Sequence, residues 1–533
     1  MYLKRNIVVE PLVDRWHAWS HLIPPATYAR NITERHLKIM DSYIGAPEVH
    51  AAAARNPKLL GGPFMDYSRR ETARVDRLRG VTRNIRTGLI ALSHALAELD
   101  TLLQREARGF SLTDLYQHVP DPLRGYVELI YDLNNHPSFR IVEPLMYRSE
   151  YYQRSAQSLM LSIINGDDRP FVLSTPRLDE QTAVHIQVPF EAPTIDRLCA
   201  MKQKSDSVDD IASALEIEVD LRQVFQRFFT SEPPPPYAAY SGPGLRWRYF
   251  GHACVLVEGK GRSILFDPVL SYTYETSISR YTYDDLPPKI DYAVITHNHQ
   301  DHVLFETLLQ LRSRIGTVVV PANNGGRLED PSLRLILQNC GFRSVVELRE
   351  MQEITDDGGV ITGIPFLGEH GDLNIASKLA YFVRWNGHRF LFAADSTNLE
   401  PRMYRHIHNW IGDVDVLFLG MECDGAPMSW LYGPLLTKPM ERAMDHSRRL
   451  AGSNYQQALR LVEEFGCKEV YVYAMGQEPW LKYMMNLKYT AESNPIIQSN
   501  RLIETCRDRG IIAERLFGEK EICVPSIRYA SSG

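Results

Sequence analysis

The sequence Tyr292-Ala293-Val294-Ile295-Thr296-His297-Asn298-His299-Gln300-Asp301-His302 decides how the second half of this chain folds. Its apolar start predicts a buried strand, and three imidazoles and one carboxylate follow within a few positions. Residues i and i+2 of an extended segment point the same way, so His297 and His299 can close on one cation. Asp301 and His302 continue into the turn and can reach a second cation. The pattern therefore predicts a metal site that holds two ions.

Length and composition limit the class of protein. The chain has 533 residues, too many for one ordinary core, and its 44% hydrophobic and 23% charged residues are typical of a soluble globular protein. A net charge of −6 argues against a nucleic-acid or membrane-surface binder, and no apolar run is long enough to predict a membrane span. The N-terminus lacks a secretory signal, and the seven scattered cysteines suit a reducing compartment. We expect a cytoplasmic protein.

A proline-rich segment divides the chain. Ser231-Glu232-Pro233-Pro234-Pro235-Pro236-Tyr237 contains four consecutive prolines, which cannot lie inside a helix or a central strand. We therefore expect an N-terminal domain at 1–231, a linker at 232–239 and a second domain at 240–533. Apolar residues at three- and four-residue spacing predict helical structure over 69–106, with further helices near 111–118, 122–134 and 207–229. A strand-like segment at 183–189 makes the N-terminal domain mainly helical α+β.

After residue 240 the pattern changes to short strands with helices between them. We expect strands at 245–250, 254–258, 263–266, 292–296, 317–320, 380–385, 389–393, 414–419 and 469–473. Helices are expected at 304–312, 333–340, 401–410 and 454–465. Interleaved strands and helices, with metal ligands at strand ends, predict an α/β fold of the αββα sandwich type.

Two further segments add candidate ligands. Glu369 and His370 lie in a loop after an apolar run, and Asp395 ends the strand-like run Phe390-Leu391-Phe392-Ala393-Ala394. Together with Gly251-His252-Ala253-Cys254-Val255, Phe266-Asp267-Pro268 and the His-x-His-x-Asp-His signature, they resemble the metallo-β-lactamase superfamily over about residues 240–480. The resemblance is specific for the fold. It is not specific for the reaction, because this superfamily includes hydrolases, transferases and oxygen-reducing diiron enzymes.

Two departures from the usual pattern select a branch of the superfamily. Most zinc hydrolases of this fold carry a histidine in the middle loop, whereas this chain offers the carboxylate of Glu369 beside His370. The usual last histidine is missing from Val470-Tyr471-Val472-Tyr473-Ala474-Met475-Gly476. His446 is the one histidine beyond position 408, so it is the simplest replacement for the missing ligand. The alternative interpretation is that His446 is an ordinary histidine on a helix surface. Mixed imidazole and carboxylate ligands suit iron or manganese, although zinc accepts carboxylates too.

With its long helical N-terminal extension, the whole chain resembles the diiron β-hydroxylases of the chloramphenicol pathway type. These enzymes use O₂ to hydroxylate the β-carbon of an amino acid that is held as a thioester on a carrier domain of a nonribosomal peptide synthetase. The resemblance implies two iron ions, an external electron donor and a homodimer built through the N-terminal domain. It also implies that His297, His299 and Glu369 bind one iron, that Asp301 and His302 bind the other, and that Asp395 bridges them. His446 is the least secure ligand. Glu369 is the candidate for the carboxylate that opens a coordination position by changing between one- and two-oxygen binding.

Weaker signals complete the expectations. Glu422 and Asp424 follow a predicted strand and either contact the substrate amine or a ligand histidine, or lie in a solvated loop. We expect Glu422, Glu369 and Asp395 to act in the reaction. Arg70, Arg74 and Arg77 share one helical face, which is a dock for an acidic carrier domain or simply a solvated face.

Two other interpretations of the whole chain stay open. A dinuclear zinc or manganese hydrolase of the same fold (a thioesterase, lactonase or phosphodiesterase) would gain support if His370 were the ligand in place of Glu369. A scaffold protein without catalytic activity is disfavoured by the nearly complete ligand set.

Overall fold

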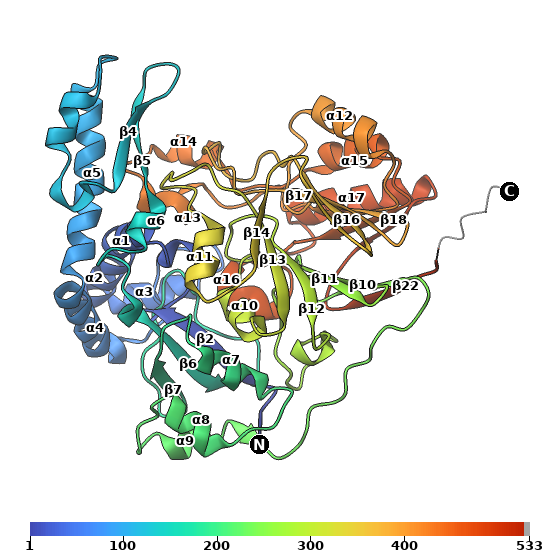
Figure 1. The fold of residues 1–533 in the computed structure, drawn as a ribbon, viewed down its shortest axis with the longest axis horizontal. Helices are drawn as coiled ribbons and strands as arrows, with labels where there is room; N and C mark the ends of the chain where they lie inside the picture. Colours follow the sequence, from blue (N-terminus) through green and yellow to red (C-terminus); the bar gives the residue numbers. More distant parts are fainter. Residues whose placement is uncertain (527–533) are drawn as a thin grey trace.

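The second half of the chain folds as two seven-stranded sheets packed face to face (Figure 1). A computed structural model describes residues 1–526. The first sheet has the order β14-β13-β12-β11-β10-β9-β22 and the second β15-β16-β17-β18-β19-β20-β21. The strands of the first sheet are β9 (Leu245–Tyr249), β10 (Val255–Gly259), β11 (Arg262–Phe266), β12 (Ile290–Val294), β13 (Ile315–Pro321), β14 (Val345–Leu348) and β22 (Lys520–Val524). Those of the second are β15 (Glu353–Asp356), β16 (Gly359–Ile364), β17 (Ala380–Trp385), β18 (His388–Phe392), β19 (Val416–Gly420), β20 (Glu469–Tyr473) and β21 (Ile512–Arg515).

Aromatic side chains fill the space between the two sheets. Phe266 of the first sheet stacks on Phe392 of the second with ring centroids 3.8 Å apart, and Phe392 stacks on Phe418 at 4.8 Å. Because side chains alternate along a strand, Leu391 points to the opposite face of the second sheet. That face is covered by α12 (Pro401–Ile411), α15 (Tyr455–Glu464) and α17 (Asn494–Asp508) (Figure 1). The predicted αββα sandwich is confirmed.

The other outer face carries α10 (Phe305–Leu311) and α11 (Leu333–Asn339), which lie toward the N-terminal region of residues 1–231 (Figure 1). This region has a four-stranded sheet in the order β3-β2-β6-β7 and a hairpin of β4 and β5. Helix α10 packs against α7 and β2 of that region. The strands are β1 (Tyr2–Leu3), β2 (Ile7–Val13), β3 (Trp16–His17), β4 (Val127–Tyr131), β5 (Pro137–Ile141), β6 (Gln157–Ile163), β7 (Val184–Gln187) and β8 (Phe229–Thr230).

Helices make up most of the rest of the N-terminal region. They are α1 (Pro25–Asn31), the π-helical turn η2 (Ile32–His36), α2 (Leu37–Gly45), α3 (Pro47–Ala54), α4 (Thr72–Ile85), α5 (Thr87–Glu106), α6 (Glu143–Met146), α7 (Pro193–Ala200), α8 (Val208–Ala214) and α9 (Arg222–Gln226). Mainly helical α+β structure is thus confirmed. None of the helices within residues 1–526 is long and apolar enough to cross a membrane.

One local prediction in this region was wrong, and another, helical structure over 69–106, is confirmed with a break inside it. The helix expected over 122–134 is the first strand of the β4–β5 hairpin, because Val127, Leu129 and Tyr131 pair with β5. The helical stretch at 69–106 is two helices that meet at Arg86, whose guanidinium pairs with Asp14 at 2.7 Å and is buried. Long-range pairing decided both outcomes, and local periodicity does not contain that information.

Strand direction places the loops of interest at one end of the sandwich. In the first sheet β9, β11 and β12 run parallel to one another, since β10 is antiparallel to both of its neighbours. In the second sheet β16, β18, β19 and β20 are parallel by the same reasoning. The segments that follow these strands therefore gather at the carboxyl ends of both sheets, where α/β folds commonly build their sites.

Candidate metal centre

The predicted metal ligands lie together, buried at this end of the sandwich. His297 and His299 follow β12, Glu369 follows β16 and Asp395 follows β18. All four side chains are buried, with His297 completely excluded from solvent. Segments separated by about a hundred residues thus bring imidazoles and carboxylates to one place, although only the histidine cluster is local in sequence.

One group of three residues can hold a first metal ion. Ligand atoms of His297, His299 and Glu369 all lie within 4.8 Å of one another. His299 Nδ1 is 3.0 Å from Glu369 Oε1, and His297 Nε2 is 3.8 Å from Glu369 Oε2. His370 is buried beside them but is not part of this group. The geometry therefore favours Glu369 over His370 as the ligand from this loop.

Asp395 lies between this group and a second one. His302 Nε2 is 3.0 Å from Asp395 Oδ2, and His297 Nε2 is 3.8 Å from the same oxygen. His302 Nε2 is also 3.7 Å from Asp301 Oδ2. Asp395 can therefore contact ions on both sides, which is the position that a bridging carboxylate needs.

Unpaired polar atoms show that these residues fit metal ions. Among residues 1–526, four buried atoms of the cluster have no hydrogen-bond partner: His297 Nε2, Glu369 Oε2, His370 Nε2 and Asp395 Oδ1. A buried polar atom without a partner costs about 1–3 kcal/mol, so this many in one place is unfavourable unless something binds them. A pair of cations would satisfy these carboxylate and imidazole atoms, and the donor set of nitrogen and oxygen suits iron.

A layer of outer residues orients the ligands. Asp267 follows β11, and its Oδ2 is 2.8 Å from His302 Nδ1, which leaves Nε2 of the ring facing Asp395. The backbone N–H and the hydroxyl of Thr296 donate to the same carboxylate at 2.8 and 2.6 Å. Histidine ligands usually have their second nitrogen held by such a carboxylate. The Phe266-Asp267-Pro268 motif was visible in the sequence, but the role of Asp267 depends on the fold.

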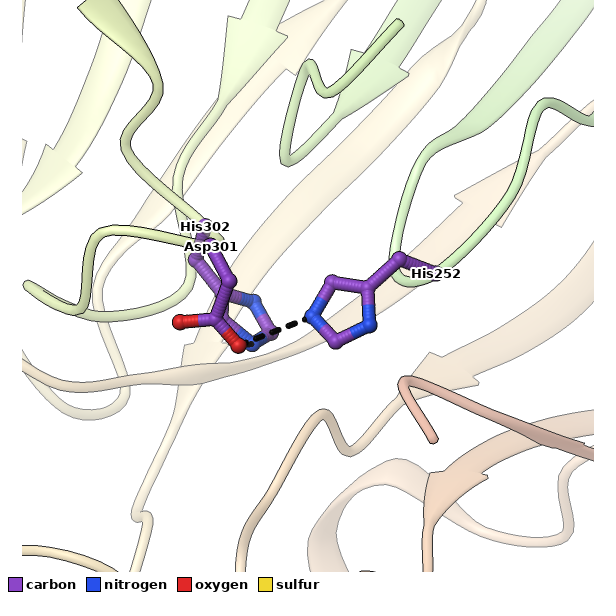
Figure 2. Close-up of side chains that lie close together, drawn as sticks. All are labelled: His252, Asp301 and His302. Carbon is purple, nitrogen blue, oxygen red and sulfur yellow. Dashed lines mark hydrogen bonds and ion pairs between the residues drawn. The ribbon is translucent and has the colours of Figure 1, made fainter. Parts of the chain in front are cut away.

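His252 is the residue that sequence reasoning left without a role. It lies in the β9–β10 loop, completely buried, and its Nε2 is 3.0 Å from Asp301 Oδ2 (Figure 2). His252, Asp301 and His302 form a further group that could hold an ion. However, the backbone N–H of Gly476 donates to His252 Nδ1 at 3.2 Å. In a neutral ring the proton then sits on Nε2, so His252 is best described as a donor that orients Asp301.

The structure does not bring His446 to the cluster, which corrects that expectation. His446 lies on the short helix α14 (Arg442–Ser447), is exposed, and belongs to no ligand group among residues 1–526. The loop after β20, where the superfamily usually has its last histidine, makes a different contact here. The N–H of Ala474 donates to the His252 carbonyl at 2.9 Å. This loop thus holds His252 in place without supplying a histidine, and His446 is a helix-surface residue at the outer part of the cavity.

The two acidic residues after β19 differ in surroundings. Asp424 is exposed and pairs with Arg449 at 3.0 Å, so it is the solvated loop residue of the alternative interpretation. Glu422 is part-buried and lines the cavity beside Asp395 and Asp301. Burial raises the pKa of Glu422 well above its ordinary value, and the charges of Asp395 and Asp301 raise it further. Glu422 therefore faces the centre and favours a cation nearby.

Burial also shifts the pKa values of the ligands. It raises the pKa of Glu369 to about 7, although His299 acts in the opposite direction. It lowers the pKa of His297 well below the ordinary value, and His302 adds to this effect. Burial would raise the pKa of Asp301, but His302 and His252 hold it below its usual range. Metal-binding groups must be deprotonated, so a cation that binds here favours the ionised form of Glu369 against the effect of burial.

The backbone is strained around the ligands. Glu369, His252 and Asp267 have φ values of +65°, +53° and +36°, in the left-handed region that non-glycine residues rarely adopt. Position 420 leaves no room for a side chain, because a Cβ on Gly420 would lie 2.4 Å from Asp395 Oδ1. Strain of this kind persists where the surrounding structure imposes it, and it gathers at functional sites.

Comparisons with known proteins agree with this geometry. A family model described as the diiron non-heme β-hydroxylase N-terminal domain matches residues 2–233, and a model of the β-lactamase superfamily domain matches residues 262–472. The chain is 40% identical over 525 residues to the 4-amino-L-phenylalanyl-[CmlP-peptidyl-carrier-protein] 3-hydroxylase of Streptomyces venezuelae, which covers 96% of this chain and 98% of that protein.

Solved structures give the same result over the whole length. The crystal structure of CmlA, a diiron β-hydroxylase from Streptomyces venezuelae, superimposes with a TM-score of 0.93 at 39% identity, covering 98% of this chain and 99% of that one. A variant of the CmlA β-hydroxylase gives 0.91 at 38% identity, covering 98% and 100%.

The fold and the buried cluster define a metallo-β-lactamase sandwich with a candidate dinuclear metal centre, and the comparisons select the oxygen-using diiron enzymes within that superfamily. More narrowly, the chain belongs to the family of diiron non-heme β-hydroxylases. The expected enzyme class and the two-iron cofactor are confirmed at the level of this family.

Proposed function

We propose that this chain hydroxylates the β-carbon of an aromatic amino acid that is held as a thioester on a carrier domain of a nonribosomal peptide synthetase. The observation that carries the proposal is the arrangement of Glu369 and Asp395 with three histidines beside a cavity. Within residues 1–526, neither carboxylate forms an ion pair with a lysine or an arginine. The Streptomyces venezuelae relative, by its name, acts on a 4-amino-L-phenylalanyl group on a peptidyl carrier protein.

The cavity suits an aromatic aminoacyl group. Its volume is about 600 Å³, and it reaches from the metal cluster to the surface between the N-terminal region and the sandwich. Glu369, Asp395 and Glu422 line it beside the metal cluster, and Lys58, Asp424, His446, Arg449 and Asn486 add further polar groups to the wall. The larger apolar side chains of the wall are Leu59, Leu60, Phe64, Trp430, Leu431, Leu450, Met485 and Leu487. A wall that combines apolar side chains with a limited number of polar groups is typical of small-molecule sites.

The stoichiometry of the reaction requires a reductant. Inserting one atom of O₂ into a C–H bond, with the other atom leaving as water, consumes two electrons and two protons from outside. We therefore propose an external electron donor as a second partner. Two irons, when bound, would supply the O₂ chemistry that side chains cannot perform.

The side chains of the chain would bind, orient and shield. His297, His299 and Glu369 would hold one ion, Asp301 and His302 the other, and Asp395 both. Both carboxylate oxygens of Glu369 lie near imidazole nitrogens, so Glu369 can bind an ion through one oxygen or through two. By changing between these two modes it would open or close a coordination position on that ion. Glu422 would hold the substrate ammonium, because a part-buried carboxylate beside other carboxylates gains from a cation.

The proposal includes a cytoplasmic homodimer. Exposed apolar side chains of the N-terminal region support self-association, namely those of Val81, Ile85, Phe110 and Leu133. The arginine face of Arg70, Arg74 and Arg77 gives less support to carrier docking. Arg74 pairs with Glu71, and the neighbouring Arg79 and Arg83 pair with Asp41, so part of the positive charge of this segment is already neutralised.

The test uses purified, iron-loaded protein with a chemical reductant and labelled O₂. A phenylalanyl or 4-aminophenylalanyl thioester on a carrier domain should gain one labelled oxygen at its β-carbon, and the free amino acid should not react. Glu422→Gln should raise the carrier-substrate KM more than it lowers kcat. Thioester hydrolysis without O₂ consumption would contradict the proposal and favour the hydrolase.

A further inference from the structure

Tyr432 contacts a candidate metal ligand from outside the cluster. It ends the helix α13 (Ser429–Tyr432) and is buried, and its hydroxyl lies 2.9 Å from His299 Nε2. The other nitrogen of the same ring, Nδ1, faces Glu369 Oε1 at 3.0 Å. A metal ion on Nδ1 leaves the proton on Nε2, so the Tyr432 oxygen is the acceptor that fixes this ring. The other histidines of the cluster have no tyrosine partner among residues 1–526.

The segment that carries Tyr432 is held by the N-terminal region. Arg35 donates to the carbonyls of Trp430 and Leu431 at 2.6 and 3.2 Å, the two residues that directly precede Tyr432 in this helical turn. Arg30 donates to the carbonyls of Pro434 and Leu436 at 3.1 and 2.9 Å. Both arginines are buried, so these contacts are worth more than surface hydrogen bonds. The position of Tyr432 thus depends on contacts that cross about 400 residues of sequence.

The element that supplies Arg35 is unusual. Residues Ile32–His36 form a π-helical turn between α1 and α2, and such turns are frequent at functional sites. Nearby, His21 is buried with neither ring nitrogen partnered within residues 1–526. Its ring lies edge-on to that of Tyr432, with centroids 5.9 Å apart. An unprotonated nitrogen of His21 is a suitable acceptor for the Tyr432 proton through a buried water, since the two side chains make no direct hydrogen bond within residues 1–526.

We propose that the N-terminal region completes the metal centre, with Arg35 and Arg30 holding Tyr432 as the partner that positions His299. Tyr432 is a positioning residue, since it acts through His299. The inference rests on the proposed metal centre, and it gives residues 1–231 a task besides docking or dimerisation: they fix the ligand geometry of one of the two ions.

The experiment compares Fe²⁺ binding to metal-free variants under anaerobic conditions, by competition with a coloured chelator. Tyr432→Phe removes only the hydroxyl. It should weaken one of two Fe²⁺ sites by about 10–100-fold, the usual effect of losing such a partner, and leave the other site unchanged. Arg35→Met should weaken the same site by a smaller factor. Tyr147→Phe is the matched control, because Tyr147 is also buried and its hydroxyl has no partner within the described chain.

The outcomes are distinguishable. Unfolding of the metal-free variants, followed by circular dichroism, identifies any general loss of folding. If Tyr432→Phe binds both ions like Tyr147→Phe, or weakens both sites equally, the positioning role is overturned. If Tyr432→Phe weakens one site and a folded Arg35→Met changes neither, the contribution of the N-terminal region is overturned. An unmodified chain that binds fewer than two ions would overturn the metal centre itself.

Discussion

Two buried clusters in this protein contain the same residue types and have opposite electrostatic surroundings. The metal centre groups histidines with Asp301, Glu369 and Asp395. A second cluster, called here the junction cluster, groups Glu10, His17 and Glu306 where the N-terminal region meets α10. Each meets the distance condition for holding a metal ion, so residue type and spacing alone do not separate them.

Arginines separate the two clusters. Arg169 donates to both oxygens of Glu306 at 2.9 and 2.6 Å, and Arg177 donates to both oxygens of Glu10 at 3.0 and 3.1 Å. Tyr272 also donates to Glu306 at 2.8 Å. The carboxylates of the metal centre have only histidine as an ionic partner within residues 1–526. The junction cluster is therefore a completed ion network, whereas the metal centre needs cations from outside.

The largest expected effect comes from changing the bridging position. Asp395→Asn should eliminate binding of one ion and weaken the other, because Asp395 is the one carboxylate placed between both groups. The metal-free variant should be no less stable than the parent, since the change removes one of several neighbouring buried carboxylates that have only histidine as an ionic partner. Metal analysis together with thermal unfolding of the metal-free form measures both. A destabilised metal-free variant would contradict the contrast with the junction cluster.

The same type of change at the junction cluster should act in the opposite way. Glu306→Gln leaves the buried Arg169 with only its longer contact to Glu10 at 3.4 Å, and breaking a buried ion pair typically costs about 3–5 kcal/mol. The variant should still bind two ions. Chemical unfolding measures the loss, with the exposed Glu150→Gln as a control. Equal stability of the two variants would show that the network is not an ionic one.

A smaller effect is expected from an outer residue. Asp267→Asn keeps the size of the side chain but weakens its hold on His302 Nδ1 and Thr296. We expect the affinity of the Asp301–His302 ion to fall by about 10–100-fold, with the other ion unchanged. Fe²⁺ titration resolves the two. A uniform loss at both sites would mean that Asp267 supports the fold more than the ligand.

The smallest effect is expected at His446. His446→Gln should change neither the number of bound ions nor their affinity, because this histidine is exposed and outside every ligand group of the described chain. Metal analysis after dialysis is sufficient. Loss of one ion from this variant would restore His446 as a ligand.

These contrasts also explain what the sequence could and could not predict. Nine of the fourteen strands of the sandwich and the segment from His297 to His302 are local patterns, and they were predicted closely. The strands β14, β15, β16, β21 and β22 were missed. Glu369 and Asp395 needed the resemblance to become ligands, because a lone strand-end carboxylate is usually a cap. The role of His252 depends on the Gly476 N–H, and that of Tyr432 on Arg35, which lies about 400 residues away. Such contacts leave no local periodicity.

The most direct test of the central claim is the metal content and optical spectrum of iron-reconstituted protein, before and after anaerobic reduction. We predict two irons per chain and a near-ultraviolet absorption that bleaches on reduction. Asp395→Asn should lose the two-iron content and this absorption, and His446→Gln should retain them. A parent protein that holds one iron or none after reconstitution, or two ions that show no redox response, would contradict a diiron centre built from these residues.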